Sequence, residues 1–217
     1  MIVDLHLKGE LVIIVGGGAE ALKKINSLLT QDCKILVLSE KTNTQIKNYV
    51  SKKKIKFKKI KLGNADFLSQ YNPYLVMATT DDRNLNRKIV NHARKMNCLA
   101  YAADDPEISD FSHPSVINIE DTVQVAISTG GRSPAMARKL KIEAEKIFKK
   151  IVNKEEIYQI KLQEIARKAA KGRISTQKER KKFLYSVLND KHIKQLIKDD
   201  EPQKAQKRAM LMLEEWK

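Results

Sequence analysis

The first residues that could do chemistry lie in a glycine-rich turn near the N-terminus. Residues 16–21 read Gly-Gly-Gly-Ala-Glu-Ala and fit the pattern G-x-G-x-x-A directly after an apolar run. In such a turn Gly16 permits the sharp bend, Gly18 lets the backbone approach a pyrophosphate, and Ala21 lets the following helix pack closely. The free N–H groups at the helix start then hold the diphosphate. The pattern favours dinucleotide binding over a purely structural glycine turn.

A carboxylate stands where dinucleotide-binding domains contact the ribose. Glu40 follows the apolar run 34–38 directly. There it would accept the adenosine ribose hydroxyls of NAD and repel the 2′-phosphate of NADP. Lys41 beside it would instead accept that phosphate. The position favours NAD, and it leaves open that Glu40 only begins the next loop.

Two further polar positions follow later apolar runs. Thr80 is expected to touch the nicotinamide side of the cofactor, while Asp81 or Asp82 either lines the site or caps the next helix. Asp104 follows the apolar run at 99–102. Oxidation by NAD removes a hydride, and a nearby carboxylate can take the accompanying proton. The same acid is equally compatible with an ordinary turn before proline.

A second glycine-bearing loop lies between a strand-like segment and a helix-like one. Its N–H groups, hydroxyls and guanidinium predict a nest for an anion or a carboxylate, formed by Ser128, Gly130, Gly131 and Arg132. Ser133 as a helix cap with Pro134 at the first helical position explains the same loop structurally. Both interpretations can hold together.

His113 is one of only four histidines. No second ligand stands at metal-binding spacing, so we expect a structural or substrate-facing histidine and no permanent metal. The sequence also contains no P-loop and no Ser/His/Asp hydrolase signature. Phosphoryl transfer and acyl hydrolysis are therefore not favoured.

The elements that must position these residues alternate along the first hundred residues. Short apolar runs predict strands at 11–15, 34–38, 75–78 and 99–102, and a further strand with outward-facing lysines is expected over roughly 56–61. Helical spacing follows the glycine turn, Thr42 is placed to cap a helix running towards residue 52, and a further helix is expected over 82–96. Strands alternating with helices predict a doubly wound, parallel, Rossmann-like α/β domain.

The pattern changes after Pro106. Residues 111–119 and 123–127 predict two strands without a crossover helix, and a helix follows over 134–150. From residue 153 onward only helices are expected, with breaks at Gly172 and Pro202. We therefore predict a nucleotide domain over 1–113, a short β-plus-helix segment over 114–150, and an all-helical domain over 151–217.

Composition limits the class of protein. The 217 residues are 42% hydrophobic and 31% charged, and no apolar run approaches the length that crosses a bilayer. The N-terminus does not resemble a signal peptide, and the two cysteines form no CxxC pair, so a cytoplasmic location is expected. The net charge of +16 predicts an anionic ligand or partner. For the lysine-rich stretch 52–61, a solvated surface is favoured over nucleic-acid binding.

The ordered set of motifs resembles one family, the precorrin-2 dehydrogenases, which also form the N-terminal part of sirohaem synthases. Order and spacing hold across residues 1–150, and the helical tail is compatible to the end. The shared residues are Val15-Gly16-Gly17-Gly18 with Ala21 and Lys23-Lys24, Ala78-Thr79-Thr80-Asp81-Asp82, Asn86, Ala103-Asp104, Phe111 with Pro114-Ser115, and Ala126-Ile127-Ser128-Thr129-Gly130-Gly131 with Ser133-Pro134 and Ala137-Arg138.

This resemblance implies NAD bound by the N-terminal domain, a homodimer formed through the middle segment, and a cleft completed by the helical tail. The family's active-site aspartate falls on Asp104 and its loop serine on Ser128. Its nucleotide contacts fall on the glycine turn near Ala19 and Glu20, and after the second strand on Glu40 and Lys41. Precorrin-2 carries several carboxylates, which would account for the basic charge.

The activity implied is NAD-dependent dehydrogenation of precorrin-2 to sirohydrochlorin, with Asp104 as general base or substrate positioner. The family also contains members that insert Fe(II) into sirohydrochlorin, which makes a bifunctional enzyme with transient Fe(II) binding the first alternative. Residues 101–103 and the pair Ser112-His113 depart from the family pattern beside the expected tetrapyrrole site. They place iron insertion in more doubt than oxidation. A non-catalytic nucleotide-sensing or nucleic-acid-binding module is the alternative from another class.

Overall fold

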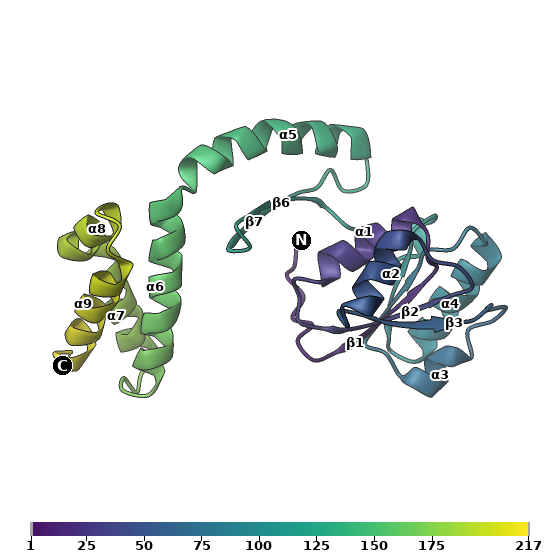
Figure 1. Cartoon of the computed structure of the whole chain (residues 1–217), viewed down its shortest axis with the longest axis horizontal. Helices are drawn as coiled ribbons and strands as arrows, with labels where there is room; N and C mark the ends of the chain where they lie inside the picture. Colours follow the sequence, from purple (N-terminus) through teal and green to yellow (C-terminus); the bar gives the residue numbers. More distant parts are fainter. Residues whose placement is uncertain (1, 217) are drawn as a thin grey trace. The chain divides into compact units, whose positions relative to one another are not determined.

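The computed structural model describes residues 2–216, which form two compact units. The first unit contains the residues up to Pro114 together with Gly130–Arg132, and the second contains Ser115–Thr129 and Ser133 onward. The elements of the first unit alternate strictly between strand and helix (Figure 1). They are β1 (Leu11–Val15), α1 (Ala19–Leu28), β2 (Lys34–Ser39), α2 (Thr44–Ser51), β3 (Lys56–Lys59), α3 (Phe67–Tyr71), β4 (Leu75–Ala78), α4 (Arg83–Lys95) and β5 (Leu99–Ala102), followed by a 3₁₀ turn at Pro106–Ile108.

The five strands form one parallel sheet in the order β3-β2-β1-β4-β5. Alternate residues of the buried strands point to opposite faces, so the sheet carries two separate cores. Ile13, Val76 and Ala100 pack with α3 and α4 on one face. Val12, Val37 and Met77 pack with α1 and α2 on the other. The predicted doubly wound α/β class is confirmed.

β3 forms an edge of this sheet and lies within the lysine-rich stretch. Its Lys56, Lys58 and Lys59 are exposed, while Phe57 is half-buried against the core. Charged side chains on an edge strand discourage pairing with a second chain. The exposed lysines of β3 are therefore explained by the fold, because they lie on a solvated edge of the sheet.

The second unit begins with a hairpin and a long helix. β6 (Ser115–Ile119) pairs antiparallel with β7 (Val123–Ile127), and α5 (Pro134–Ile151) packs on both strands. Ser133 caps α5 by accepting a hydrogen bond from Met136 N, with Pro134 at the first helical position, as predicted. The strand predicted from residue 111 begins only at Ser115.

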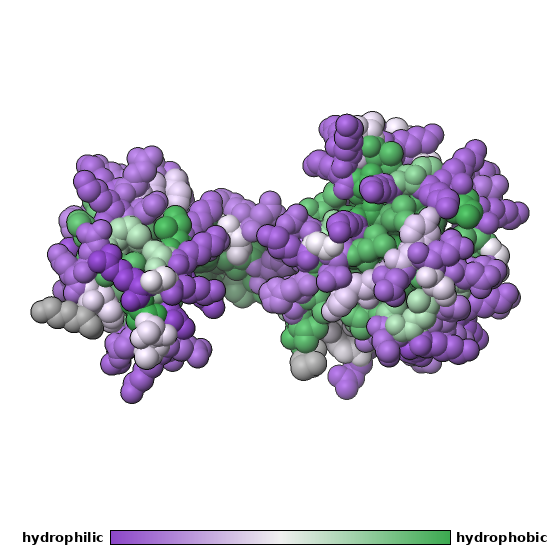
Figure 2. Space-filling view, turned by 90° about the horizontal axis from the view of Figure 1, so that it is seen from below, coloured by the Kyte–Doolittle hydropathy of each residue, from purple (hydrophilic) through white to green (hydrophobic). Residues whose placement is uncertain are grey.

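The remainder of the second unit consists of four helices, α6 (Lys154–Lys171), α7 (Gln177–Asn189), α8 (Lys191–Lys198) and α9 (Pro202–Glu214). Phe183 is fully buried among them and meets Trp216 edge-on at 5.3 Å between ring centroids. The helix breaks fall at Gly172 and before Pro202, as the sequence predicts. Figure 2 shows mostly hydrophilic side chains on the visible surface of each unit, with apolar patches between them. Among the described residues, no helix combines the length and apolarity that a bilayer span requires.

Candidate active site

The carboxyl ends of the parallel strands surround a cavity of about 800 Å³. It lies where the chain order reverses, between β1 and β4, which is the position at which open α/β sheets bind ligands. Its walls come from the glycine turn after β1 and from the residues that follow β2, β3 and β4. The lining residues are Val15, Gly16, Gly17, Gly18, Ala19, Glu20, Lys23, Leu38, Ser39, Glu40, Lys41, Thr42, Asn43, Ile60, Lys61, Leu62, Thr79, Thr80, Asp81 and Leu85.

The three glycines of the turn lie in three different surroundings. Gly16 has φ of +117°, and a Cβ there would stand 2.7 Å from the carbonyl oxygen of Thr79. A Cβ on Gly17 would stand only 2.0 Å from the carbonyl oxygen of Lys41, whereas a Cβ on Gly18 would meet nothing within 4 Å. Gly17, an unspecified position in the sequence pattern, is therefore the tightest of the three. The open space at Gly18 is where a ligand can approach the backbone.

The start of α1 suits a diphosphate. Gly18 precedes the helix and supplies no side-chain cap, so the first N–H groups are not taken by a capping side chain. Such N–H groups, with the helix dipole, bind phosphate oxygens. Ala21 is fully buried and lets the helix pack against the sheet. These features fit the NAD pyrophosphate that the sequence predicts here.

Glu20 in the first turn of α1 carries its charge with two lysine partners. Its carboxylate lies 2.9 Å from Lys23 Nζ and 3.5 Å from Lys24 Nζ. Burial raises the pKa of Glu20, but the Lys23 hydrogen bond and both ammonium charges outweigh it, so the pKa lies below its usual value. The lysines offset the negative charge that Glu20 would otherwise set against a diphosphate.

The loop after β2 brings Glu40 and Lys41 to the cavity wall, beside Lys61 from the end of β3. Asn43, and not the expected Thr42, caps α2 by accepting a hydrogen bond from Ile46 N. Asn43 also donates its side-chain amide to Gly18 O at 3.3 Å and its backbone N–H to Gly17 O. It thus ties the loop to the glycine turn, a role that its type and spacing did not indicate.

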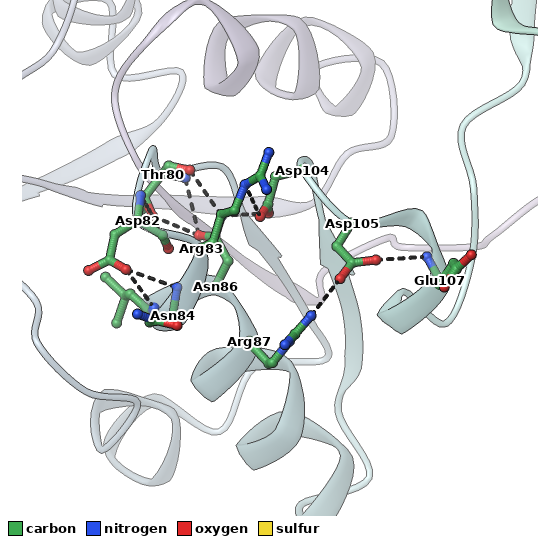
Figure 3. A network of polar contacts seen from close by, with 10 residues as sticks. Thr80, Asp82, Arg83, Asn84, Asn86, Arg87, Asp104, Asp105 and Glu107 are labelled. Carbon is green, nitrogen blue, oxygen red and sulfur yellow. Dashed lines mark hydrogen bonds and ion pairs between the residues drawn. The ribbon is translucent and has the colours of Figure 1, made fainter.

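The end of β4 is connected to the predicted acid through one buried side chain. Asn86, on α4, accepts a hydrogen bond from Thr80 Oγ1 at 2.7 Å and donates to Asp104 Oδ1 at 2.7 Å (Figure 3). Thr80 lines the cavity, while Asp104 does not. Asp82, the second alternative at this turn, caps α4 through Asn84 N and Leu85 N. The structure therefore joins Thr80 to Asp104 through Asn86.

Asp104 has a second neighbour, Arg83, whose Nε lies 4.0 Å from Oδ2. The Arg83 side chain is 86% exposed and that of Asp104 is 22% exposed. The adjacent Asp105 points elsewhere, since it accepts from Arg87 at 3.1 Å and from Glu107 N (Figure 3). Of this acid pair, Asp104 is the one that contacts Asn86, which in turn contacts the cavity residue Thr80.

His113 lies in an aromatic cluster on the α1 face of the sheet. Its ring meets Tyr101 edge-on at 4.9 Å and Phe111 at 5.4 Å. Lys24 Nζ lies 4.3 Å from the centre of the Tyr101 ring. Burial and the Lys24 charge lower the pKa of His113 to about 4. The residue as a whole is nevertheless exposed to water, and the lowered pKa favours the neutral imidazole.

The loop that contains Ser128 and Arg132 has the structure of a strand-to-helix turn. Gly130 and Gly131 adopt φ of +61° and +80°, and Ser133 N donates to Thr129 Oγ1 at 3.0 Å. Both glycines are thus needed by the backbone. An anion-binding role for Ser128, Gly130, Gly131 and Arg132 stays a prediction, and His113 does not line the cavity described above.

The fold and the cavity define a dinucleotide-binding domain, and comparisons with known proteins agree. Residues 3–115 match the family model described as "Putative NAD(P)-binding", and residues 121–143 match the model for the central part of sirohaem biosynthesis proteins. The chain belongs to this NAD(P)-binding family.

Similar proteins include two bacterial sirohaem synthases. The one from Nitrosococcus oceani is 32% identical over 144 residues, which are 66% of this chain and 30% of that protein. The one from Actinobacillus succinogenes is 28% identical over 213 residues, 94% of this chain and 41% of that protein. This chain thus spans less than half the length of these relatives. A solved structure of SirC, a precorrin-2 dehydrogenase, shares the fold with a TM-score of 0.68 at 19% identity, with both chains covered completely.

Proposed function

We propose that this chain oxidises precorrin-2 to sirohydrochlorin with NAD as the oxidant. The observation that carries the proposal is the connection of the NAD(P) cavity to a carboxylate through Thr80, Asn86 and Asp104. The names of the sirohaem synthases and of the SirC structure supply the substrate class. The net charge of +16 suits a polycarboxylate substrate.

In this proposal the chain's own residues bind the cofactor and move one proton. Gly16, Gly18, Ala19 and Glu20 form the diphosphate cradle, Ala21 lets it close on the sheet, and Glu40 with Lys41 holds the adenosine ribose. Thr80 contacts the nicotinamide end. NAD, when bound, supplies the acceptor for the hydride that leaves a substrate C–H bond. Asp104 takes the proton, a new C=C bond forms in the macrocycle, and the products are sirohydrochlorin, NADH and a proton.

The remaining predicted contacts concern the substrate. Ser128, Gly130, Gly131 and Arg132 would bind its carboxylates through N–H groups, a hydroxyl and a guanidinium. His113 is proposed as a neutral, substrate-facing imidazole.

Anaerobic incubation with precorrin-2 and NAD tests the proposal. The sirohydrochlorin spectrum should develop together with NADH absorbance, in equal amounts. Asp104→Asn should abolish turnover while the Kd for NAD changes less than about twofold, since Asp104 does not line the cofactor cavity. Wild-type protein that binds NAD yet leaves precorrin-2 unchanged would refute the proposed reaction.

We also propose a homodimer formed through the hairpin and α5. Four apolar side chains of α5 are more than 40% exposed at the helical spacing i, i+4, i+11 and i+15, namely Met136, Leu140, Ile147 and Ile151. This spacing places them on one side of the helix. Val116 on β6 is also exposed. A second copy of the same segment would cover such a stripe symmetrically.

Two narrower proposals concern location and iron. Cys33 and Cys98 are both free, and burial raises the pKa of Cys98 to about 11, which suits a reducing cytoplasm. Cell fractionation tests that location.

Fe(II) would enter only as a transient substrate, with Asp104 accepting pyrrole N–H protons. A rate of iron insertion into sirohydrochlorin equal to the uncatalysed rate would remove this second activity.

A further inference from the structure

Among the residues that the structure describes, Asn86 is the one polar residue that is fully buried, and it joins the cofactor cavity to the proposed base. It extends from the first turns of α4, which begins just after Asp82, into the space between the ends of β4 and β5 (Figure 3). Its exposed fraction is 0%. A polar side chain buried to this degree must have its hydrogen-bonding groups satisfied, or it destabilises the fold.

The Asn86 amide is satisfied entirely by two residues. Its Oδ1 accepts from Thr80 Oγ1 at 2.7 Å and from Thr80 N at 3.3 Å. Its Nδ2 donates to Thr80 O at 2.9 Å and to Asp104 Oδ1 at 2.7 Å. An amide has two N–H donors and two acceptor lone pairs, so every group is used.

The chemistry of the site requires an amide here. An aspartate of the same shape would keep the acceptor facing Thr80 but would set oxygens against Thr80 O and Asp104 Oδ1, with no proton between them. A leucine would leave four polar groups of the two partners without this contact, namely Thr80 N, Thr80 Oγ1, Thr80 O and Asp104 Oδ1. The residue type is thus fixed by what lies on its two sides.

We propose that Asn86 is a positioning residue that fixes the orientation of the Asp104 carboxylate and couples it to Thr80 in the cofactor cavity. Arg83 is a poor substitute for this task, because it stands 4.0 Å from the carboxylate and its side chain is 86% exposed. Asn86 holds one oxygen, Oδ1, which leaves Oδ2 to accept the substrate proton. The inference rests on the proposed oxidation of precorrin-2.

The test compares Asn86→Asp with Asn84→Asp. Asn84 is exposed on the same helix, so its substitution makes the same change of charge two residues away, without touching Asp104. In Asn86→Asp, kcat for precorrin-2 oxidation at neutral pH should fall about 10- to 150-fold, the equivalent of about 1.5–3 kcal/mol for a hydrogen bond to a charged group. The Kd for NAD should change less than about threefold, because the acceptor for Thr80 is retained. Asn84→Asp should leave both values near those of the wild type.

A pH profile separates positioning from a general loss of structure. Two facing carboxylates cannot both ionise easily, so Asn86→Asp should hold a shared proton at low pH. That proton restores a donor between positions 86 and 104. The activity of Asn86→Asp relative to wild type should therefore rise as the pH falls. Of the nearby charges, Arg83 is exposed, Asp82 is bound to helix N–H groups, and Asp105 is paired with Arg87.

Each outcome decides the inference. Wild-type protein that fails to oxidise precorrin-2 would end the proposed function, and with it this role. An active wild type with an Asn86→Asp variant equal to Asn84→Asp would end this role alone, as would equal losses of NAD binding and turnover without any change in pH profile.

If Asn86→Asp is too unstable to assay, a double variant that exchanges the two side chains tests the same contact. In Asn86→Asp combined with Asp104→Asn, an amide again faces a carboxylate, with donor and acceptor reversed. This double variant should melt at a higher temperature than Asn86→Asp alone and remain inactive, because the base is gone. A double variant no more stable than Asn86→Asp would show that the 86–104 contact is not what the asparagine provides, and would overturn the inference.

Discussion

Replacing Gly17 by alanine should distort the cofactor cavity while leaving the rest of the fold in place. The added Cβ would stand 2.0 Å from the Lys41 carbonyl oxygen and 3.0 Å from Ser39 Oγ. The closest approach that real Cβ atoms tolerate is about 1 Å longer than the first distance, so one wall of the cavity must move. Overpacking of this kind costs about 1–3 kcal/mol. The loop after β2 gives way more easily than the glycine turn, since it is held by hydrogen bonds from Asn43 and Ser39 rather than by the sheet.

Because that loop carries the proposed ribose contacts, the same 1–3 kcal/mol would appear as a loss of NAD affinity of about 5- to 150-fold. Isothermal titration calorimetry measures the Kd, and thermal unfolding measures the stability. Gly63→Ala is the matched control, since a Cβ there would meet nothing within 4 Å. An affinity and a melting temperature for Gly17→Ala equal to those of Gly63→Ala would refute the steric argument.

Three further predictions concern specificity, protonation and assembly. Glu40→Ser removes an exposed charge near the expected 2′-phosphate. The ratio of NADP affinity to NAD affinity should rise about fivefold, as expected for about 1 kcal/mol between charges in water. Fluorescence titration with both nucleotides measures this ratio. The His113 imidazole should stay neutral from pH 8 to about 5, because burial and a neighbouring ammonium lower its pKa to about 4; in an NMR titration, a resonance assigned through His113→Gln that titrates near the usual value would contradict this. Leu140→Asp with Ile147→Asp should convert dimers to monomers in light scattering, whereas Ile142→Asp, exposed on another side of α5, should not.

Much of the fold follows from the sequence, because the central strands β1, β2 and β4 are short and largely buried. The apolar run Leu11–Val15 predicts a buried strand, and the glycine turn after it sets the start of α1. Hydrophobic periodicity failed to predict the secondary structure where contacts with side chains from other elements determine it. The five-residue helix α3 was not predicted, and the residues before Ser115 form no strand although their composition favours one. Phe111 is instead half-buried against Tyr101.

The site was predictable in its parts but not in its connections. The pattern G-x-G-x-x-A identifies Gly16 and Gly18, yet the tightest position is the unspecified Gly17, which only the path of the β2–α2 loop explains. The sequence identifies Asn86 as one of the residues shared with the precorrin-2 dehydrogenases, but it assigns the residue no role. Its role depends on three-dimensional contacts with residues six positions before it and eighteen positions after it.

The β4–α4–β5 unit explains why those contacts arise together. The register of the parallel pair sets Ala78 opposite Ala102, so two residues further along each strand end stand Thr80 and Asp104. The crossover helix between the strands must begin at the same edge of the sheet, and its early turns therefore reach the gap between the two ends. A side chain there can bridge them, and an asparagine can do so with donors and acceptors matched on both sides. A single crossover unit thus supplies the cofactor contact, the acid and the group that holds them in register, so that a shift of α4 would move the bridge away from both partners at once.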